Sequence, residues 1–193
     1  MMRIAFPLIL CCGVCAAALG GFAPATAAAR NRAEIVEVYL KPHMKNLELS
    51  LHIENCFTPK MEEAILSGVE TTFKILLVLE KKGFLFFSNK LLNLSLEHSI
   101  KYDRLNNEFH VTLPEQPGKV LATADFAEAK QWMSRVEDLS LIPVWRLEKE
   151  TEYKLRIKAE LSKVRLPLFF RYIFYFVSLW DFETKWHEVT FTL

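Results

Sequence analysis

Residues 153–161 read Tyr-Lys-Leu-Arg-Ile-Lys-Ala-Glu-Leu, and apolar side chains alternate strictly with charged ones along this stretch. Successive side chains of a β-strand point to opposite faces, so the pattern predicts a strand with one buried and one solvated face. Residues 46–53, Asn-Leu-Glu-Leu-Ser-Leu-His-Ile, show the same alternation. Such strands are typical of antiparallel sheets that pack one face on a core.

Four further segments are predicted to be strands. Residues 69–80 are apolar on both faces in their second half, which favours a central strand. Residues 92–102 and 109–113 alternate on either side of Asn106-Asn107, a turn signal, and together predict a hairpin. Residues 182–193 are rich in Thr, Val, Phe and Trp and are predicted to be a closing strand.

Helices interrupt this pattern in two places. Thr58-Pro59 is a typical helix start and Gly68 a typical stop, so we predict a helix over 59–67. Between 124 and 138 the apolar period becomes helical; the residues concerned are Ala129, Trp132, Met133, Val136 and Leu139. The sequence therefore predicts a mainly β (α+β) protein, an antiparallel sheet or sandwich of about seven to eight strands with two to three helices.

The N-terminal residues 1–29 have the three parts of a secretory signal peptide. Arg3 supplies a positive start, residues 4–22 are apolar, and residues 23–29 are small with an A-x-A pattern. We expect cleavage after Ala27 or Ala29, one β-rich exported domain over residues 30–193, and a periplasmic or secreted location. A retained signal would instead leave a single N-terminal anchor.

Charge and cysteine usage exclude several classes. The chain holds 24 Lys and Arg against 23 Asp and Glu, and Arg3 is the only charged residue of the signal, so the remainder is formally neutral. We therefore expect no nucleic-acid binding. Cys56 is the only cysteine beyond the signal, so no internal disulfide is expected, and we predict that Cys56 is a small buried hydrophobic residue.

The segment 166–180 is unusually aromatic and contains a single charge, Arg171. It is shorter than the roughly 20 apolar residues of a membrane helix, so no transmembrane span is expected after signal cleavage. In one interpretation it is a helix that begins at Pro167 and buries its aromatic side chains in the core. In the other, part of it is exposed together with Phe84 and Phe86 and binds lipid or a partner.

Motifs for chemistry are missing from the sequence. None of the five histidines has metal-ligand spacing, and only His98 falls on an apolar strand face, where a hydrogen-bonded core residue is the usual occupant. There is no G-x-S-x-G motif, and the six glycines are not spaced to bind phosphate. We therefore expect no cofactor, no metal and no enzymatic activity.

The C-terminal motif runs Trp180-Asp181-Phe182-Glu-Thr184-Lys-Trp186. Asp181 is interpreted as a residue that caps backbone N–H groups or pairs with Arg171 or Arg165, because an unpaired buried carboxylate is costly.

This motif, with Leu166-Pro167-Leu168 before it and the basic alternating strand 153–161, resembles the signature of an uncharacterised family of exported bacterial proteins, domain of unknown function 4390. The resemblance runs from about Glu34 to the C-terminus. It implies a secreted single domain of proteobacteria, with an amphipathic strand after the signal and no established activity, cofactor or catalytic residue. Genes of this family often lie near a nitrogen-regulation-type sensor histidine kinase, which implies an envelope partner of that kind.

Two functional hypotheses follow. The first is a periplasmic β-rich domain that works by protein–protein contact, with its surface around Phe84, Phe86, Arg171 and the C-terminal motif. The alternative is a carrier or sensor of a lipid or other apolar small molecule, held between the sheet and residues 166–180.

Overall fold

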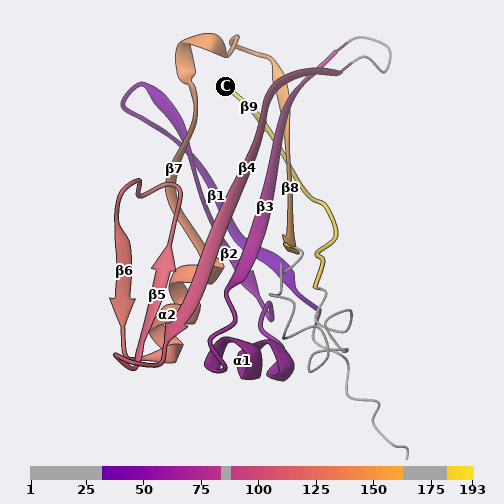
Figure 1. Cartoon of the computed structure of the whole chain (residues 1–193). Helices are drawn as coiled ribbons and strands as arrows, with labels where there is room; N and C mark the ends of the chain where they lie inside the picture. Colours follow the sequence, from indigo (N-terminus) through magenta and orange to yellow (C-terminus); the bar gives the residue numbers. More distant parts are fainter. Residues whose placement is uncertain (1–31, 84–87, 163–181) are drawn as a thin grey trace, which may run out of the picture. The chain divides into compact units, whose positions relative to one another are not determined.

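A computed structural model describes residues 32–83, 88–162 and 182–193 (Figure 1). The chain divides into two compact units, 1–30 and 31–193, and only the second is described. The described residues of that unit are mainly β and form two antiparallel sheets of three and six strands and two α-helices, which confirms the predicted fold class. Within its described residues, no helix combines the length and the apolar character that crossing a membrane requires.

The smaller sheet has the strand order β1-β2-β7. Its strands are β1 (Glu34–His43), β2 (Asn46–Glu54) and β7 (Arg135–Pro143). The alternation that predicted β2 is confirmed, because Leu47, Leu49, Leu51 and Ile53 are buried while the residues between them are not.

The larger sheet has the order β6-β5-β4-β3-β8-β9. Its strands are β3 (Thr71–Lys82), β4 (Ser88–Asp103), β5 (Glu108–Thr112), β6 (Val120–Thr123), β8 (Glu152–Leu161) and β9 (His187–Thr192). β3 is flanked by β4 and β8, as its apolar faces predicted. β4 and β5 form the predicted hairpin, with Asn107 in the left-handed conformation at its turn.

Two capped helices and one short 3-10 turn complete the described part. Helix α1 (Pro59–Leu66) is capped by Thr58, whose hydroxyl accepts from the Met61 N–H at 3.3 Å. Gly68 follows the helix with φ +87°. Helix α2 (Phe126–Ser134) is capped by Asp125 in the same way. The 3-10 turn η1 spans Val144–Arg146. Figure 1 shows α1 and α2 at one end of the sheets.

The predicted helix over 124–138 is wrong beyond Ser134, because the backbone at Arg135 turns extended and strand β7 begins there. Val136 and Leu139 are buried as predicted, but as inward residues of a strand that pairs with β2. A helical spacing of apolar residues across a helix–strand junction mimicked one longer helix. Strand β6 was not predicted, because only four residues form it.

The closing strand is shorter than predicted, since β9 begins at His187 rather than at Phe182. Glu183 pairs with Glu160 of β8, and His187 pairs with Ile157. From Glu183 to His187 the C-terminal segment advances by four residues, whereas β8 advances by three from Glu160 to Ile157. One extra residue therefore interrupts the ladder, as in a β-bulge.

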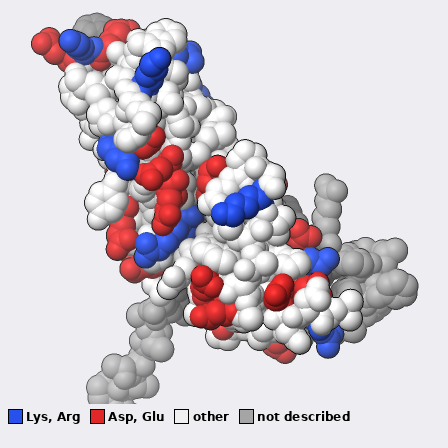
Figure 2. All heavy atoms as spheres, turned by 90° about the vertical axis from the view of Figure 1, so that its left-hand side faces the viewer, with Lys and Arg blue, Asp and Glu red and all other residues white. Residues whose placement is uncertain are grey.

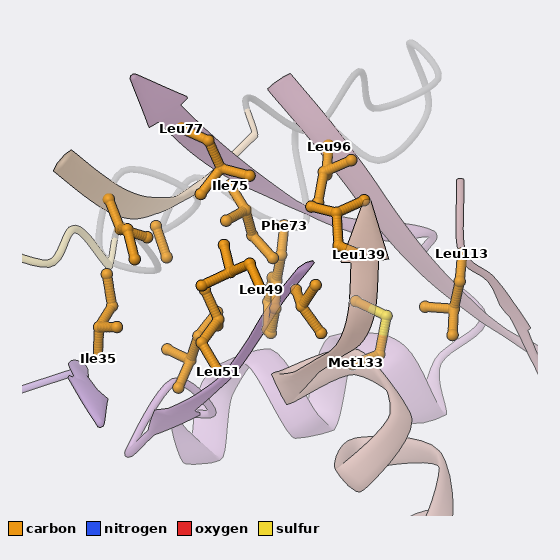
Figure 3. Close-up of a cluster of buried hydrophobic side chains, with 14 of the residues drawn as sticks. Ile35, Leu49, Leu51, Phe73, Ile75, Leu77, Leu96, Leu113, Met133 and Leu139 are labelled. Atoms are coloured by element: carbon orange, nitrogen blue, oxygen red, sulfur yellow. The ribbon is translucent and has the colours of Figure 1, made fainter. Parts of the chain in front are cut away.

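One hydrophobic core fills the space between the sheets. Leu49 and Leu51 of β2 lie beside Phe73 and Ile75 of β3 in this cluster (Figure 3). Met133 of α2 also belongs to it. At one side β1 touches β8, and at the other α2 contacts β5, β6 and β7, so that α2 closes the second side.

Cys56 belongs to this core, as predicted. Its thiol is buried and donates to the Ile53 carbonyl at 3.3 Å. Burial raises the pKa of the thiol to about 12, so Cys56 stays protonated and unreactive at neutral pH.

Candidate functional site: a pocket beside a buried histidine–glutamate pair

A pocket of about 560 Å³ lies between two segments of the chain. One segment runs from the end of β5 into β6, and the other from the last turn of α2 into β7. The pocket therefore occupies the side of the sandwich where β6 and β7 are edge strands of their sheets. The lining residues are Leu113, Glu115, Gln116, Lys119, Leu121, Gln131, Trp132, Arg135 and Glu137.

His98 lies directly behind one lining residue, Glu115. It sits on the inner face of β4 between Leu96 and Ile100, and its side chain is completely buried. Its Nδ1 is 3.1 Å from the Met133 carbonyl oxygen, and its Nε2 is 3.0 Å from Glu115 Oε1 and 3.2 Å from Oε2. The imidazole therefore ties β4, the loop after β5 and the end of α2 together.

The hydrogen bonds of His98 determine where its protons lie. A carbonyl oxygen can only accept, so Nδ1 must carry the proton that it shares with Met133. The contact from Nε2 to Glu115 then requires a second proton, held by the imidazole or by the carboxyl group. Burial opposes the charge of Glu115, but the hydrogen bond and the positive charge of His98 outweigh it and lower the pKa of that carboxyl. One proton therefore lies between Nε2 and the carboxyl group, and the pair as a whole carries no net charge.

The opposite side of the pocket carries different chemistry. Trp132 is half-buried, packs against the core and offers an aromatic surface. Arg135 and Lys119 are exposed, and neither side chain has a hydrogen bond or ion pair with any described residue. Figure 2 shows the face that carries β6, on which acidic and basic residues are mixed. The pocket therefore combines an aromatic wall with two cations whose side chains are not paired within the described part of the chain.

The arrangement favours binding over proton transfer. The imidazole of His98 is enclosed by the Met133 carbonyl and Glu115, so it presents no free nitrogen to a bound molecule. Among the described residues, no three His, Cys, Asp or Glu side chains come together in a way that would hold a metal ion. What the pocket offers is an aromatic surface, two amides and several fixed charges.

The described residues of the predicted C-terminal site lie elsewhere, beside residues 159–161 at the end of β8. Phe182 is buried and packs edge-on against Phe73, with ring centroids 4.8 Å apart. Thr184 is also buried: its N–H donates to the Ala159 carbonyl at 2.9 Å, and its Oγ1 accepts from the Ala159 N–H at 3.0 Å. Both residues fasten the C-terminal segment to β8.

Trp186 lies on the outer face of the same sheet and is 41% exposed. Its ring is 5.1 Å from the Arg156 guanidinium and 5.9 Å from the Lys158 ammonium, both within cation–π range. Arg156 also pairs with Glu80 at 3.3 Å, and Lys158 with Glu183 at 2.5 Å. Trp186 thus covers an ion-pair network.

The remaining predicted site residues, Phe84, Phe86, Arg171, Trp180 and Asp181, lie outside the described residues, as do the signal and the segment 166–180.

Comparison with known proteins gives one result. Residues 30–190 match the family described as domain of unknown function DUF4390. The chain belongs to the DUF4390 family. No curated protein and no solved structure gives a significant match.

The pocket of this DUF4390 domain was not predicted from the sequence. Its walls come from segments that are adjacent only in the folded chain, and none of its lining residues forms a motif. One signal pointed toward it: His98 on an apolar strand face, which we interpreted as a hydrogen-bonded core residue. That interpretation is confirmed by its two buried partners.

Proposed function

We propose that this DUF4390 domain is an exported, non-catalytic protein that binds a protein partner in the cell envelope through the pocket between β6 and β7. Export rests on the signal-like residues 1–29, with cleavage after Ala27 or Ala29 and release into the periplasm or the medium. The envelope portion of a membrane sensor is the partner class that the family resemblance suggests.

The composition of the pocket is the observation that supports this proposal. Six of its nine lining residues are polar or charged, and the rest include one tryptophan. Carriers of apolar molecules bind them in predominantly hydrophobic cavities, whereas protein contact sites combine aromatic anchors with a polar rim. The pocket therefore favours a protein contact over the carrier hypothesis.

Site-specific photo-crosslinking in the native host tests the proposal. A photoreactive phenylalanine analogue is placed at Gln116, an exposed residue that lines the pocket, and at Leu105, which is 93% exposed in the turn between β4 and β5. Because both positions are solvent-accessible, they differ mainly in location. We expect position 116, and not position 105, to give one discrete adduct with an envelope protein, identified by mass spectrometry.

Further measurements make the outcome decisive. The adduct from position 116 should disappear in an Arg135→Gln background whose melting temperature is unchanged. Equal labelling from positions 116 and 105, or none from 116, would contradict the proposal. Native mass spectrometry of the same preparation covers the alternative: a reproducible bound lipid would favour the carrier. The intact mass also tests cleavage after Ala27 or Ala29.

A further inference from the structure

We propose that the pocket binds a carboxylate attached to a flat apolar group, with Arg135 and Lys119 holding the carboxylate and Trp132 packing on the apolar part. The proposal rests on the binding function proposed above and adds the chemistry of what is bound. The carboxylate can come from an acidic side chain of a partner or from a free small acid, and the experiment below separates these sources.

The first argument is the charge balance of the pocket. His98 and Glu115 share one proton between Nε2 and the carboxylate, at 3.0 Å, so as a pair they carry no net charge. Three charged lining residues remain, the cations Lys119 and Arg135 and the anion Glu137. The pocket therefore has a surplus of positive charge, although the chain beyond the signal is formally neutral.

The second argument is the geometry of the two cations. Lys119 comes from the β5–β6 side of the pocket and Arg135 from the β7 side, so they approach from opposing walls. Neither is committed to a carboxylate of the described residues, whereas Lys130 and Arg156 each have one. A guanidinium presents parallel N–H groups that match the two oxygens of a carboxylate, and an ammonium adds a point charge.

The third argument is the position of Trp132, in the last turn of α2 and three residues before Arg135. It is held against the core on one side and lines the pocket on the other. An aromatic wall beside a cation fits a ligand with an anionic end and an apolar body.

The size of the pocket agrees with such a ligand. A volume of about 560 Å³ lies within the roughly 300–1,000 Å³ of sites for small molecules.

The experiment is an NMR titration of the full chain, labelled with ¹⁵N, with phenylacetate and with phenylacetamide, which has the same shape but no charge. We expect phenylacetate to shift the indole N–H signal of Trp132 and the amide signals of residues 115–121 and 131–137. Phenylacetamide should bind at least about tenfold more weakly, as expected for the loss of a charge-assisted hydrogen bond. Arg135→Gln should weaken phenylacetate by a similar factor and leave phenylacetamide unchanged.

Arg146→Gln is the matched control, because Arg146 is an exposed arginine on η1, outside the pocket, and its variant should bind phenylacetate like the unmodified chain. Two acetylated dipeptide amides, Phe-Asp and Phe-Asn, then identify the source. Tighter binding of Phe-Asp than of phenylacetate supports an acidic side chain of a partner, and the reverse order supports a free small acid.

Equal affinity for phenylacetate and phenylacetamide would overturn the inference, as would full binding by Arg135→Gln or shifts confined to other surfaces. These failures are distinct from a failure of the proposed function. A specific adduct from position 116 without a preference for carboxylates would leave partner binding in place and remove only the ligand chemistry.

Discussion

The C-terminal motif and the pocket differ in how their polar groups are used. In the motif, Phe182 and Thr184 are buried and satisfied, and each contact is made to a neighbouring part of the same sheet. In the pocket, the side chains of Arg135 and Lys119 have no hydrogen bond or ion pair among the residues that the structure covers. The motif that stands out most in the sequence therefore serves cohesion, whereas the site suited to binding carries no motif.

The largest expected effect tests the cohesive role of the motif. Phe182→Ala removes a buried ring that packs against Phe73, so we expect a loss of about 3–5 kcal/mol in the free energy of unfolding. Urea denaturation measures it. Trp145→Ala, at a tryptophan that is 79% exposed, is the control and should change stability by about 0.5 kcal/mol or less. A loss below about 1 kcal/mol for Phe182→Ala would show that the motif does not hold the fold.

An intermediate effect is expected at Glu115, which lines the pocket and is also paired with the buried His98. Glu115→Gln keeps the shape and a hydrogen bond to His98 but removes the carboxylate, at a cost of about 1–3 kcal/mol at pH 7. The folded-state pKa of Glu115 is lowered from its ordinary value of 4.5, so its stabilisation is complete above about pH 4.5 and is lost as the pH falls through the lowered value. The two proteins should therefore converge in stability in acid.

Thermal unfolding between pH 3 and pH 7 provides the measurement for this prediction. Glu137→Gln, at an exposed carboxylate of the same pocket, is the matched control and should follow the unmodified protein at every pH. A constant difference between Glu115→Gln and the unmodified protein over this range would rule out the linkage to the Glu115 carboxyl.

The smallest effect concerns a single hydrogen bond of the motif. Thr184→Val conserves shape but leaves the Ala159 N–H without the hydroxyl acceptor that it contacts at 3.0 Å. We expect a loss of about 1–2 kcal/mol, typical of a buried donor left unsatisfied. Thr184→Ser keeps the hydroxyl and should retain more stability than the valine variant does. The opposite order in a urea melt would show that the methyl group of Thr184, and not its hydroxyl, matters.

Much of the fold was predictable because alternation is a local property. Residues i and i+2 of a strand lie on the same face, so β2 and β8 could be recognised from their own residues alone. The junction at Ser134 was not, because the burial of Val136 depends on β2, which lies far away in the sequence. Tertiary pairing overrode the local period there.

The pocket was beyond prediction for a related reason. Glu115 and Arg135 belong to segments that lie side by side only in the folded chain. Composition indicates neither their proximity nor that His98 neutralises Glu115. A resemblance to DUF4390 did identify the family, but that family carries no site residues to transfer onto these positions.

The direct passage from α2 to β7 links the pocket mechanically to the smaller sheet. Ser134 ends the helix and Arg135 begins the strand, with no loop between them to absorb a displacement. We therefore expect a molecule that displaces Trp132 also to weaken the pairing of Val136 with Leu51. The rate of amide hydrogen exchange at Val136, whose side chain is buried in the core, would then report whether the pocket is occupied.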